Sequence, residues 1–276
     1  MSLPKFNIYI NKKSVPINDR GLNYGDGIFE TILVRNKKAI FIDDHLTRLC
    51  NGCAKLGIKK PTLVLIKKNI KLCIGSTNNC ILKILLTRGS SQFGYSFSDK
   101  LIPNIYFIKI KAEKKKVLNS SVKLGISKVY LDSIPTLSKI KHLNRLEQVL
   151  AVNELNAHPL YSDLLLLSKE ENIIETISSN IFFVRNNNDR LIFETPIIDK
   201  YGIDGILRKK IIQYLKKIKM RVIIKDISIR DLNCYNACFK TNSINGVILI
   251  DQIQKKKFSR PNLLYNILDD FIYINA

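Results

Sequence analysis

Alternation of apolar and polar residues in the first third of the chain predicts β-strands. A period of two places every second side chain on the same face of a sheet, where it can be buried. The runs that alternate in this way, or are short and apolar, cover residues 6–10, 28–34, 39–42, 80–87 and 104–110. The second and third runs flank Asn36-Lys37-Lys38, which predicts a hairpin there.

Helical patterns lie between and after these runs. Asp43-Asp44 is expected to cap a helix that extends to about Leu56 and ends at Gly57. Apolar residues near helical spacing predict a second helix over residues 142–156. Further helices are expected from Gly205 and after Pro261. Strands are expected at residues 122–130, 163–167, 173–177, 181–184, 191–193 and 221–225.

One segment interrupts these patterns. Residues 112–120, AEKKKVLNS, are mostly polar and have no clear period, so they are predicted to form a linker. The chain would then have a small N-terminal α/β domain at residues 1–111 and a larger C-terminal α/β domain at 121–276. The expected fold class is mixed α/β, rich in hairpins.

Charge is the most unusual property of the composition. The chain has 45 Lys and Arg residues against 23 Asp and Glu residues, a formal net charge of +22. Such an excess is typical of proteins that bind nucleic acid or anionic surfaces. Here the excess is mostly lysine and is spread along the chain, and Lys, Ile and Asn are abundant together, as in A/T-biased coding sequences. A solvated basic surface is therefore favoured, with neither nucleic acid nor membrane as a partner.

The chain is expected to be a cytoplasmic protein. No stretch approaches the roughly 18 apolar residues of a membrane-spanning helix, and the first seven residues lack the apolar region of a secretory signal. Two cysteine pairs, Cys50 with Cys53 and Cys234 with Cys238, could hold zinc. Because the first pair lies in a helical pattern, reduced buried thiols are favoured over a metal site.

Four segments carry residue types suited to catalysis. The glycine-rich segment at 19–31, DRGLNYGDGIFET, requires a tight backbone, although a structural turn would have the same composition. Arg48 lies on an otherwise apolar helix face, where burial would require an anionic partner. Lys141 stands where a loop meets a helix, and neighbouring cations and desolvation in a cleft would lower its pKa.

The fourth group is C-terminal and comprises residues 175–180 (ETISSN), 202–208 (GIDGILR) and 241–243 (TNS). Gly205 before a helix offers backbone N–H groups to a phosphate, and the Ser243 hydroxyl can add a donor. Ordinary turn and capping chemistry is the alternative for each of these segments.

In this order and spacing, the segments resemble the fold-type IV pyridoxal-phosphate enzymes. This family contains branched-chain aminotransferases, D-amino acid aminotransferases and 4-amino-4-deoxychorismate lyases. The resemblance extends from Asp19 to Gly246. The segment KHLNRLEQVLA, which begins at Lys141, looks most like the lyases, as does Thr87-Arg88-Gly89 followed by Gly94-Tyr95-Ser96. The resemblance implies a site between the two domains and a homodimer.

The resemblance also implies roles for individual residues. Lys141 matches the lysine that binds pyridoxal phosphate covalently, and Glu175 matches the carboxylate at the pyridine nitrogen. The other positions that match cofactor-binding residues are Arg48, Asn180, the backbone of Ile206 and Leu207, and Ser243. The positions on the substrate side are Tyr24, Thr31 and Arg88.

The lyase branch implies conversion of 4-amino-4-deoxychorismate to 4-aminobenzoate and pyruvate, a step of folate biosynthesis. An aminotransferase with the same cofactor residues is the alternative, and a basic binding protein without catalysis is an alternative outside the family. Intact Lys141, Glu175 and Arg48 argue against the last. One departure concerns Phe93, because the lyase pattern implies an arginine before Gly94-Tyr95, so a cation is missing here. If that cation contacts the substrate carboxylate, substrate recognition would differ in this chain.

Overall fold

The chain divides into two compact units, which are described separately. The structure is a computed structural model and describes residues 5–92, 94–112, 122–132, 134–187 and 190–275. The first unit comprises Met1–Lys114 and Ile140–Arg145, and the second comprises Lys115–Lys139 and Leu146–Ala276. The segment that contains Lys141 therefore belongs to the N-terminal unit. Of the predicted linker at 112–120, all but Ala112 lies outside the described residues.

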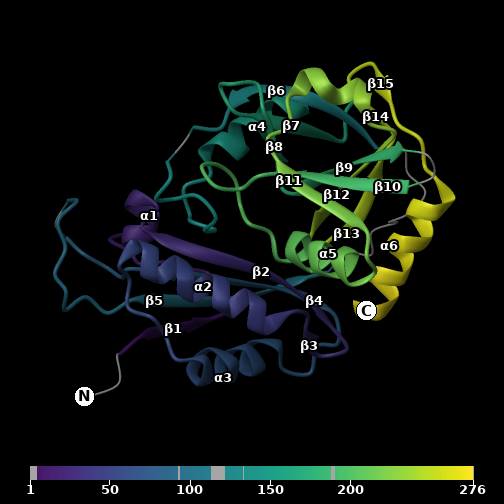
Figure 1. The fold of residues 1–276 in the computed structure, drawn as a ribbon. Coiled ribbons are helices and arrows are strands. Elements are labelled where there is room, and N and C mark those ends of the chain that lie inside the picture. The colour runs from purple at the N-terminus through teal and green to yellow at the C-terminus, as the bar shows by residue number, and fades with distance from the viewer. Residues whose placement is uncertain (1–4, 93, 113–121, 133, 188–189, 276) are drawn as a thin grey trace. The chain divides into compact units, whose positions relative to one another are not determined.

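The first unit is built on a five-stranded sheet with strand order β1-β5-β4-β2-β3 (Figure 1). Its strands are β1 (Asn7–Ile10), β2 (Gly27–Arg35), β3 (Lys38–Ala39), β4 (Cys80–Thr87) and β5 (Asn104–Lys111). Only β1 and β5 are parallel, and the other neighbours are antiparallel. Every strand predicted in this part of the chain is therefore confirmed, except that the third run is shorter, because Ile42 begins a helix.

The helices of the first unit are α1 (Arg20–Tyr24), α2 (Ile42–Leu56) and α3 (Leu63–Ile74). Helices α2 and α3 pack on one face of the sheet, where alternate strand residues are fully buried. Ile32 of β2, Leu82 of β4 and Phe107 of β5 form this core with Leu46 of α2 and Ile66 of α3. The period-two pattern read from the sequence thus gives the buried face of the sheet.

The predicted cap of α2 is wrong, although the helix and its end are confirmed. Phe41 occupies the N-cap with a φ of 52° and makes no side-chain capping bond, whereas Asp43 and Asp44 lie in the first turn. Carboxylates there still interact favourably with the helix dipole. Gly57 ends the helix in the left-handed conformation, with a φ of 63°.

The second unit contains two five-stranded sheets, with orders β11-β10-β9-β12-β13 and β15-β14-β6-β7-β8. Its strands are β6 (Lys123–Tyr130), β7 (Asp163–Leu167), β8 (Ile173–Thr176), β9 (Asn180–Asn187), β10 (Arg190–Pro196), β11 (Arg221–Lys225), β12 (Ala237–Asn242), β13 (Gly246–Ile250), β14 (Gln252–Ile253) and β15 (Lys256–Lys257). Buried residues of both sheets, including Leu124, Leu165 and Phe183, form one core. The strands predicted for this half are confirmed, with ends that differ by a few residues.

The helices of the second unit are α4 (Leu146–Asn156), α5 (Ile206–Lys217), α6 (Asn262–Asn275) and the 3-10 helix η1 (Ile229–Cys234). Helices α5 and α6 begin after Gly205 and Pro261, as predicted. The predicted start of α4 at His142 is wrong, because residues Ile140–Arg145 group with the first unit and Lys141 bonds to β2. Among the described residues, no helix has both the length and the apolar character needed to cross a bilayer.

Candidate active site

The glycine-rich segment before β2 is fixed by a buried aspartate. Asp19 is fully buried and caps α1 by accepting a hydrogen bond from the Gly21 N–H at 2.7 Å. Its other carboxylate oxygen accepts hydrogen bonds from Thr87, Asn104 and Tyr106, at 3.0, 2.7 and 2.7 Å. These bonds tie the segment to β4 and β5, so Asp19 has a structural role.

The glycines of this segment allow the backbone segment that carries Lys141 to pack closely against it. Gly25 has a φ of 64°, and a Cβ atom there would lie 2.1 Å from the Asn144 side chain. A Cβ atom on Gly27 would lie 2.5 Å from a backbone oxygen of β4. The N–H of Phe29 donates to the carbonyl of Lys141 at 2.8 Å. Lys141 therefore lies on a backbone strip held against the edge of β2, not within a helix.

The Lys141 side chain extends over the ring of Phe29. Its Nζ lies 4.3 Å from the ring centroid, and the Nζ of Lys83 lies 5.6 Å from the same centroid. The ring faces both ammonium groups, which a π face attracts. The next residue, His142, is mostly buried, and its pKa falls to about 4 because of burial and the charges of Arg145 and Lys141. His142 is thus neutral near pH 7 and adds no third charge.

Arg48 meets the anionic partner that its position requires. Its Nε and Nη2 donate to the two carboxylate oxygens of Glu30, each at 2.7 Å, and His45 contacts the same carboxylate at 2.6 Å. Burial alone would raise the pKa of Glu30, but the Arg48 charge and the hydrogen bonds from Arg48 and His45 lower it to about 2. Glu30 and His45 were not predicted as site residues. The signal that could have identified Glu30 in the sequence is an acidic residue at a buried position of an otherwise apolar strand.

Neutralising Glu30 is expected to destabilise the protein. Glu30→Gln leaves a buried guanidinium without its counter-charge, which costs about 3 kcal/mol at pH 7. Because the carboxyl pKa is about 2 when folded and ordinarily 4.5, the unfolded chain binds more protons between these values. The contribution of Glu30 is therefore complete above pH 4.5 and declines as the pH falls toward 2. Urea unfolding of both proteins across this range measures it.

The control for this measurement is Glu171→Gln. Glu171 pairs with Arg230 at 2.6 Å, but both side chains are exposed. Exposed pairs contribute well under about 1 kcal/mol, so this variant is expected to resemble the parent. An equal loss of stability in both variants, or a Glu30→Gln deficit that does not shrink below pH 4, would refute the assignment.

The three residues predicted on the substrate side differ in their surroundings. Tyr24 ends α1 with 37% of its surface exposed, and Thr31 is half-buried on the same face of β2 as Phe29. Arg88 is buried and donates to Asp26 and to the carbonyl oxygens of Leu56 and Gly57. These contacts favour a structural role for Arg88, and its contact with substrate stays a prediction. Phe93 lies outside the described residues.

In the second unit, Glu175 lies at the end of β8 and is 4% exposed. Its Oε2 accepts a hydrogen bond from the Ile203 N–H at 3.0 Å. A Cβ atom on Gly202 would lie 3.2 Å from the same oxygen, and Gly202 has a φ of 71°. The loop therefore wraps closely around the carboxylate, which only glycine permits at this point. A carboxylate held in this way can keep a ring nitrogen protonated.

The N-terminus of α5 resembles an anion-binding site. Gly205 is the N-cap and makes no side-chain capping bond. The Asn180 amide instead donates to the Ile203 carbonyl at 2.9 Å, and a Cβ atom on Gly205 would lie 2.0 Å from the Asn180 Oδ1. The first N–H groups of a helix, among them those of Ile206 and Leu207, have no intrahelical acceptor. They can therefore donate to a phosphate.

Two buried hydroxyls near these elements fit the same ligand. Within the described residues, Thr176 and Thr241 have buried Oγ1 atoms with no hydrogen-bond partner. Thr176 directly follows Glu175 and is the last residue of β8. Thr241 lies near the end of β12, and Ser243 lies two residues later, in the turn after this strand. Buried hydroxyls normally find partners, so they suit a bound group with acceptor oxygens. The amine of Lys141, the carboxylate of Glu175 and these donors match the functional groups of pyridoxal phosphate.

The cysteines add no chemistry to these two sets of residues. All six are free thiols, and burial raises the pKa of Cys53 to about 12, with a further contribution from Cys50. Among the described residues there is no group of three or more His, Cys, Asp or Glu placed to bind a metal ion.

Comparison with known families shows which family the chain belongs to. The sequence profile described as "Amino-transferase class IV" matches residues 27–253. The chain is a class IV aminotransferase-family protein. This confirms the resemblance drawn from the sequence, and enzymes of this family depend on pyridoxal phosphate.

Individual relatives of this class IV protein include lyases and aminotransferases. An aminodeoxychorismate lyase of Vibrio harveyi is 29% identical over 87% of this chain and 87% of its own length. A D-alanine aminotransferase of Bacillus licheniformis is 25% identical over 87% and 83%. The crystal structure of 4-amino-4-deoxychorismate lyase from Pseudomonas aeruginosa has a TM-score of 0.86 at 27% identity and covers 94% of each chain. The predicted fold-type IV architecture is confirmed.

Proposed function

We propose that this class IV enzyme is a pyridoxal-phosphate-dependent lyase that converts 4-amino-4-deoxychorismate to 4-aminobenzoate and pyruvate. The observation that carries the proposal is the similarity to lyases of this name over most of the chain, both in sequence and in fold. The segment KHLNRLEQVLA around Lys141 supports the lyase branch. The place of this step in folate biosynthesis is part of the proposal.

Each proposed role uses a group described above. Bound pyridoxal phosphate supplies an electron sink. Lys141 would hold the cofactor, and its Nζ, once free, would accept the proton from the carbon that bears the substrate nitrogen. The bond to the enolpyruvyl oxygen breaks, the ring becomes aromatic, and the departing enol is protonated to pyruvate. Glu175 keeps the pyridine nitrogen protonated throughout.

The phosphate is proposed to be bound by the N-terminus of α5, by Ser243 and by Arg48. The two hydrogen bonds that Arg48 donates to Glu30 fix the orientation of its guanidinium group. An arginine held rigidly loses little conformational freedom when it binds a phosphate oxygen. Asn180 is proposed to act through the loop, since its amide supports the Ile203 carbonyl beside Gly205.

A paired assay tests the proposed reaction. Release of pyruvate and 4-aminobenzoate from 4-amino-4-deoxychorismate is measured beside transamination between amino-acid donors and oxo-acid acceptors. The aminotransferases among the relatives make the second reaction the alternative. Lyase turnover that exceeds transamination is expected. Transamination without pyruvate release would make the protein an aminotransferase.

Replacing Gly205 with alanine is expected to weaken cofactor binding. The new Cβ atom would overlap the Asn180 amide, which must move and disturb the start of α5. Loss of one charged hydrogen bond to the phosphate raises the dissociation constant about tenfold. Fluorescence titration of the cofactor-free protein measures the constant. Gly94→Ala is the control, because a Cβ atom there meets no atom within 4 Å, and equal affinity in both variants would contradict the phosphate site.

We also propose that the protein is a cytoplasmic homodimer and that α4 lies in the dimer interface. Three apolar residues of this helix, Leu146, Val149 and Leu150, are 75%, 53% and 51% exposed. A second copy would bury them, which is the usual fate of a contiguous apolar helix face. Leu150→Glu is therefore expected to halve the mass measured by light scattering. Val64→Glu, which changes an exposed apolar residue of another helix, α3, should leave it unchanged, and an unaltered mass for Leu150→Glu would exclude this interface.

A further inference from the structure

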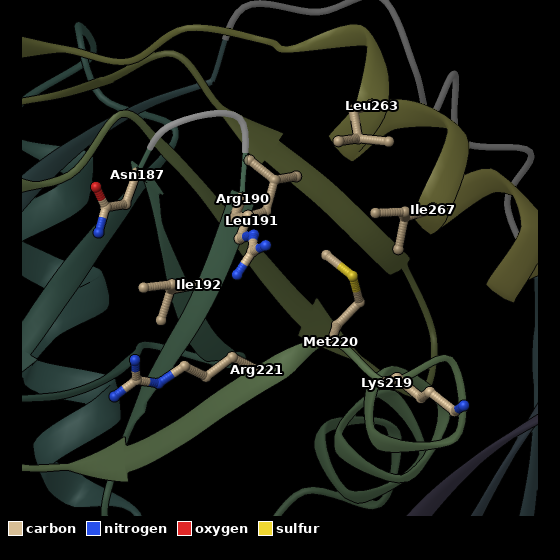
Figure 2. A pocket seen from close by; sticks show the side chains of 9 residues that line it. All are labelled: Asn187, Arg190, Leu191, Ile192, Lys219, Met220, Arg221, Leu263 and Ile267. Atoms are coloured by element: carbon tan, nitrogen blue, oxygen red, sulfur yellow. The ribbon is translucent and has the colours of Figure 1, made fainter.

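A cavity of about 550 Å³ lies in the second unit, apart from the elements that carry Glu175 and the α5 N-terminus. It is formed where β9 ends, β10 and β11 begin, and α6 passes over them (Figure 2). This volume lies in the range of small-molecule sites, about 300–1,000 Å³. None of the roles assigned above involves its lining residues.

The cavity has a cationic side made by Arg190 and Arg221. Arg190 and Ile192 lie on the same face of β10, and Arg221 is the partner of Ile192 in the register with β11, so both arginines lie on one face of the sheet (Figure 2). In contrast, Lys219 points away from them. Within the described part of the chain, neither guanidinium group has an ion-pair or side-chain hydrogen-bond partner, and both residues are exposed. A carboxylate could therefore bind to them without displacing an anionic side chain of the described residues.

The lack of ion-pair partners among the described residues sets these two arginines apart from most others. The arginines that form ion pairs with protein carboxylates are Arg20, Arg48, Arg88, Arg185, Arg208, Arg230 and Arg260. Arginine is also the minority cation in this lysine-rich sequence. Its planar fork binds carboxylates through two parallel hydrogen bonds, which lysine cannot do. Two such groups on one cavity indicate recognition of an anion.

The opposite side of the cavity is apolar. Met220 lies between the arginines and α6, and Leu263 and Ile267 of α6 face it (Figure 2). Leu191 completes this side and is 4% exposed. The unbranched thioether of methionine adapts to ligands of different shape. A ligand that fits both sides has one anionic end and an apolar body.

We propose that this cavity binds a small organic carboxylate with an apolar tail, of the medium-chain fatty-acid type. The carboxylate is held by Arg190 and Arg221, and the tail packs on Met220, Leu263 and Ile267. A second cavity, in the first unit, has about 390 Å³ and is lined by Lys37, Lys67 and Lys71. Lys67 already pairs with Asp43 at 2.7 Å, so this cavity serves as the comparison site.

Titration calorimetry of the cofactor-loaded protein with sodium octanoate tests the proposal. One saturable site is expected. Acetate, which lacks the tail, and 1-octanol, which lacks the charge, should each bind at least about tenfold more weakly. The double variant Arg190→Gln, Arg221→Gln should lose about tenfold or more in affinity, and Met220→Ser should weaken octanoate while leaving the acetate response unchanged.

Two variants serve as controls for charge alone. Lys219→Gln removes a cation of the same cavity that points away from the arginines, and Lys71→Gln removes one from the comparison site. Both should bind octanoate within about twofold of the parent, because screened exposed charges act weakly at a distance. Unchanged binding in the arginine double variant, an equal loss in the Lys71 variant, or no saturable binding would overturn the proposal. Near-parental thermal unfolding shows that each variant is folded.

Discussion

Lys141→Ala is expected to abolish both the visible absorbance of the bound cofactor and nearly all lyase turnover. The variant would lose the amine proposed to attach the cofactor and the base proposed to accept the substrate proton. A general base alone contributes about 10²- to 10⁴-fold, so a fall on the order of 10⁴-fold or more is expected for the combined loss. Absorption spectra and pyruvate release measured on the same preparations report the two effects separately.

Lys139→Ala is the matched control for this experiment. Lys139 is exposed and lies two residues before Lys141. Its backbone N–H bonds to the Gly202 carbonyl at 3.1 Å, a bond that does not depend on the side chain. The control should therefore keep the spectrum and the activity of the parent. Activity close to the parent level in Lys141→Ala, or an equal loss in Lys139→Ala, would end the assignment of Lys141.

Glu175→Gln is expected to have the second largest effect, a fall of about 10²-fold in kcat. The amide has nearly the size of the carboxylate and keeps an oxygen that can accept from Ile203, so the loop around it should survive. What disappears is the negative charge that keeps a ring nitrogen protonated. The loss should therefore appear in kcat and in the pH dependence of the cofactor spectrum, with little change in cofactor affinity.

Glu170→Gln provides the comparison for Glu175. Glu170 is exposed in the turn between β7 and β8, and its carboxylate accepts a hydrogen bond from Tyr201 at 3.0 Å. Its replacement should leave kcat within about twofold of the parent, as expected for surface positions. If Glu175→Gln lowered only the thermal stability and left kcat and the spectrum intact, Glu175 would be structural.

Most strands could be predicted from the sequence because each has one buried face. Helix α3 was not predicted. Its sequence, LVLIKKNIKLCI, is rich in apolar and branched residues that are equally typical of strands. Its start is set by Thr62, whose hydroxyl accepts from the Leu65 N–H. Whether a short apolar run of this kind forms a helix or a strand is decided by tertiary packing rather than by local preference.

The start of α4 also could not be predicted from the local sequence. Helical spacing continues back to His142, but residues Ile140–Arg145 form backbone bonds with β2 instead. Such bonds depend on a strand more than a hundred residues earlier, and no local pattern reports them. The apolar residues that gave α4 its helical period are mostly exposed in the single chain. The helical period therefore predicted α4 but did not indicate which of its apolar residues are buried.

The candidate site could be predicted residue by residue only through its resemblance to a family. Arg48 has an anionic partner, as predicted, but this partner is Glu30, a residue of another element. Pairings of this kind arise from the packing of α2 on β2. Likewise, the close fit of Gly202 around Glu175 depends on a loop that a linear pattern does not describe.

Reduction of the purified protein with borohydride, followed by peptide mapping, is the most direct test of whether Lys141 carries the cofactor. Borohydride fixes the cofactor permanently to the lysine that carries it. A single modified peptide with the cofactor on Lys141 is expected, and no modification is expected in Lys141→Ala. Cofactor fixed to another lysine, or none fixed to a protein that turns over substrate, would contradict this role of Lys141.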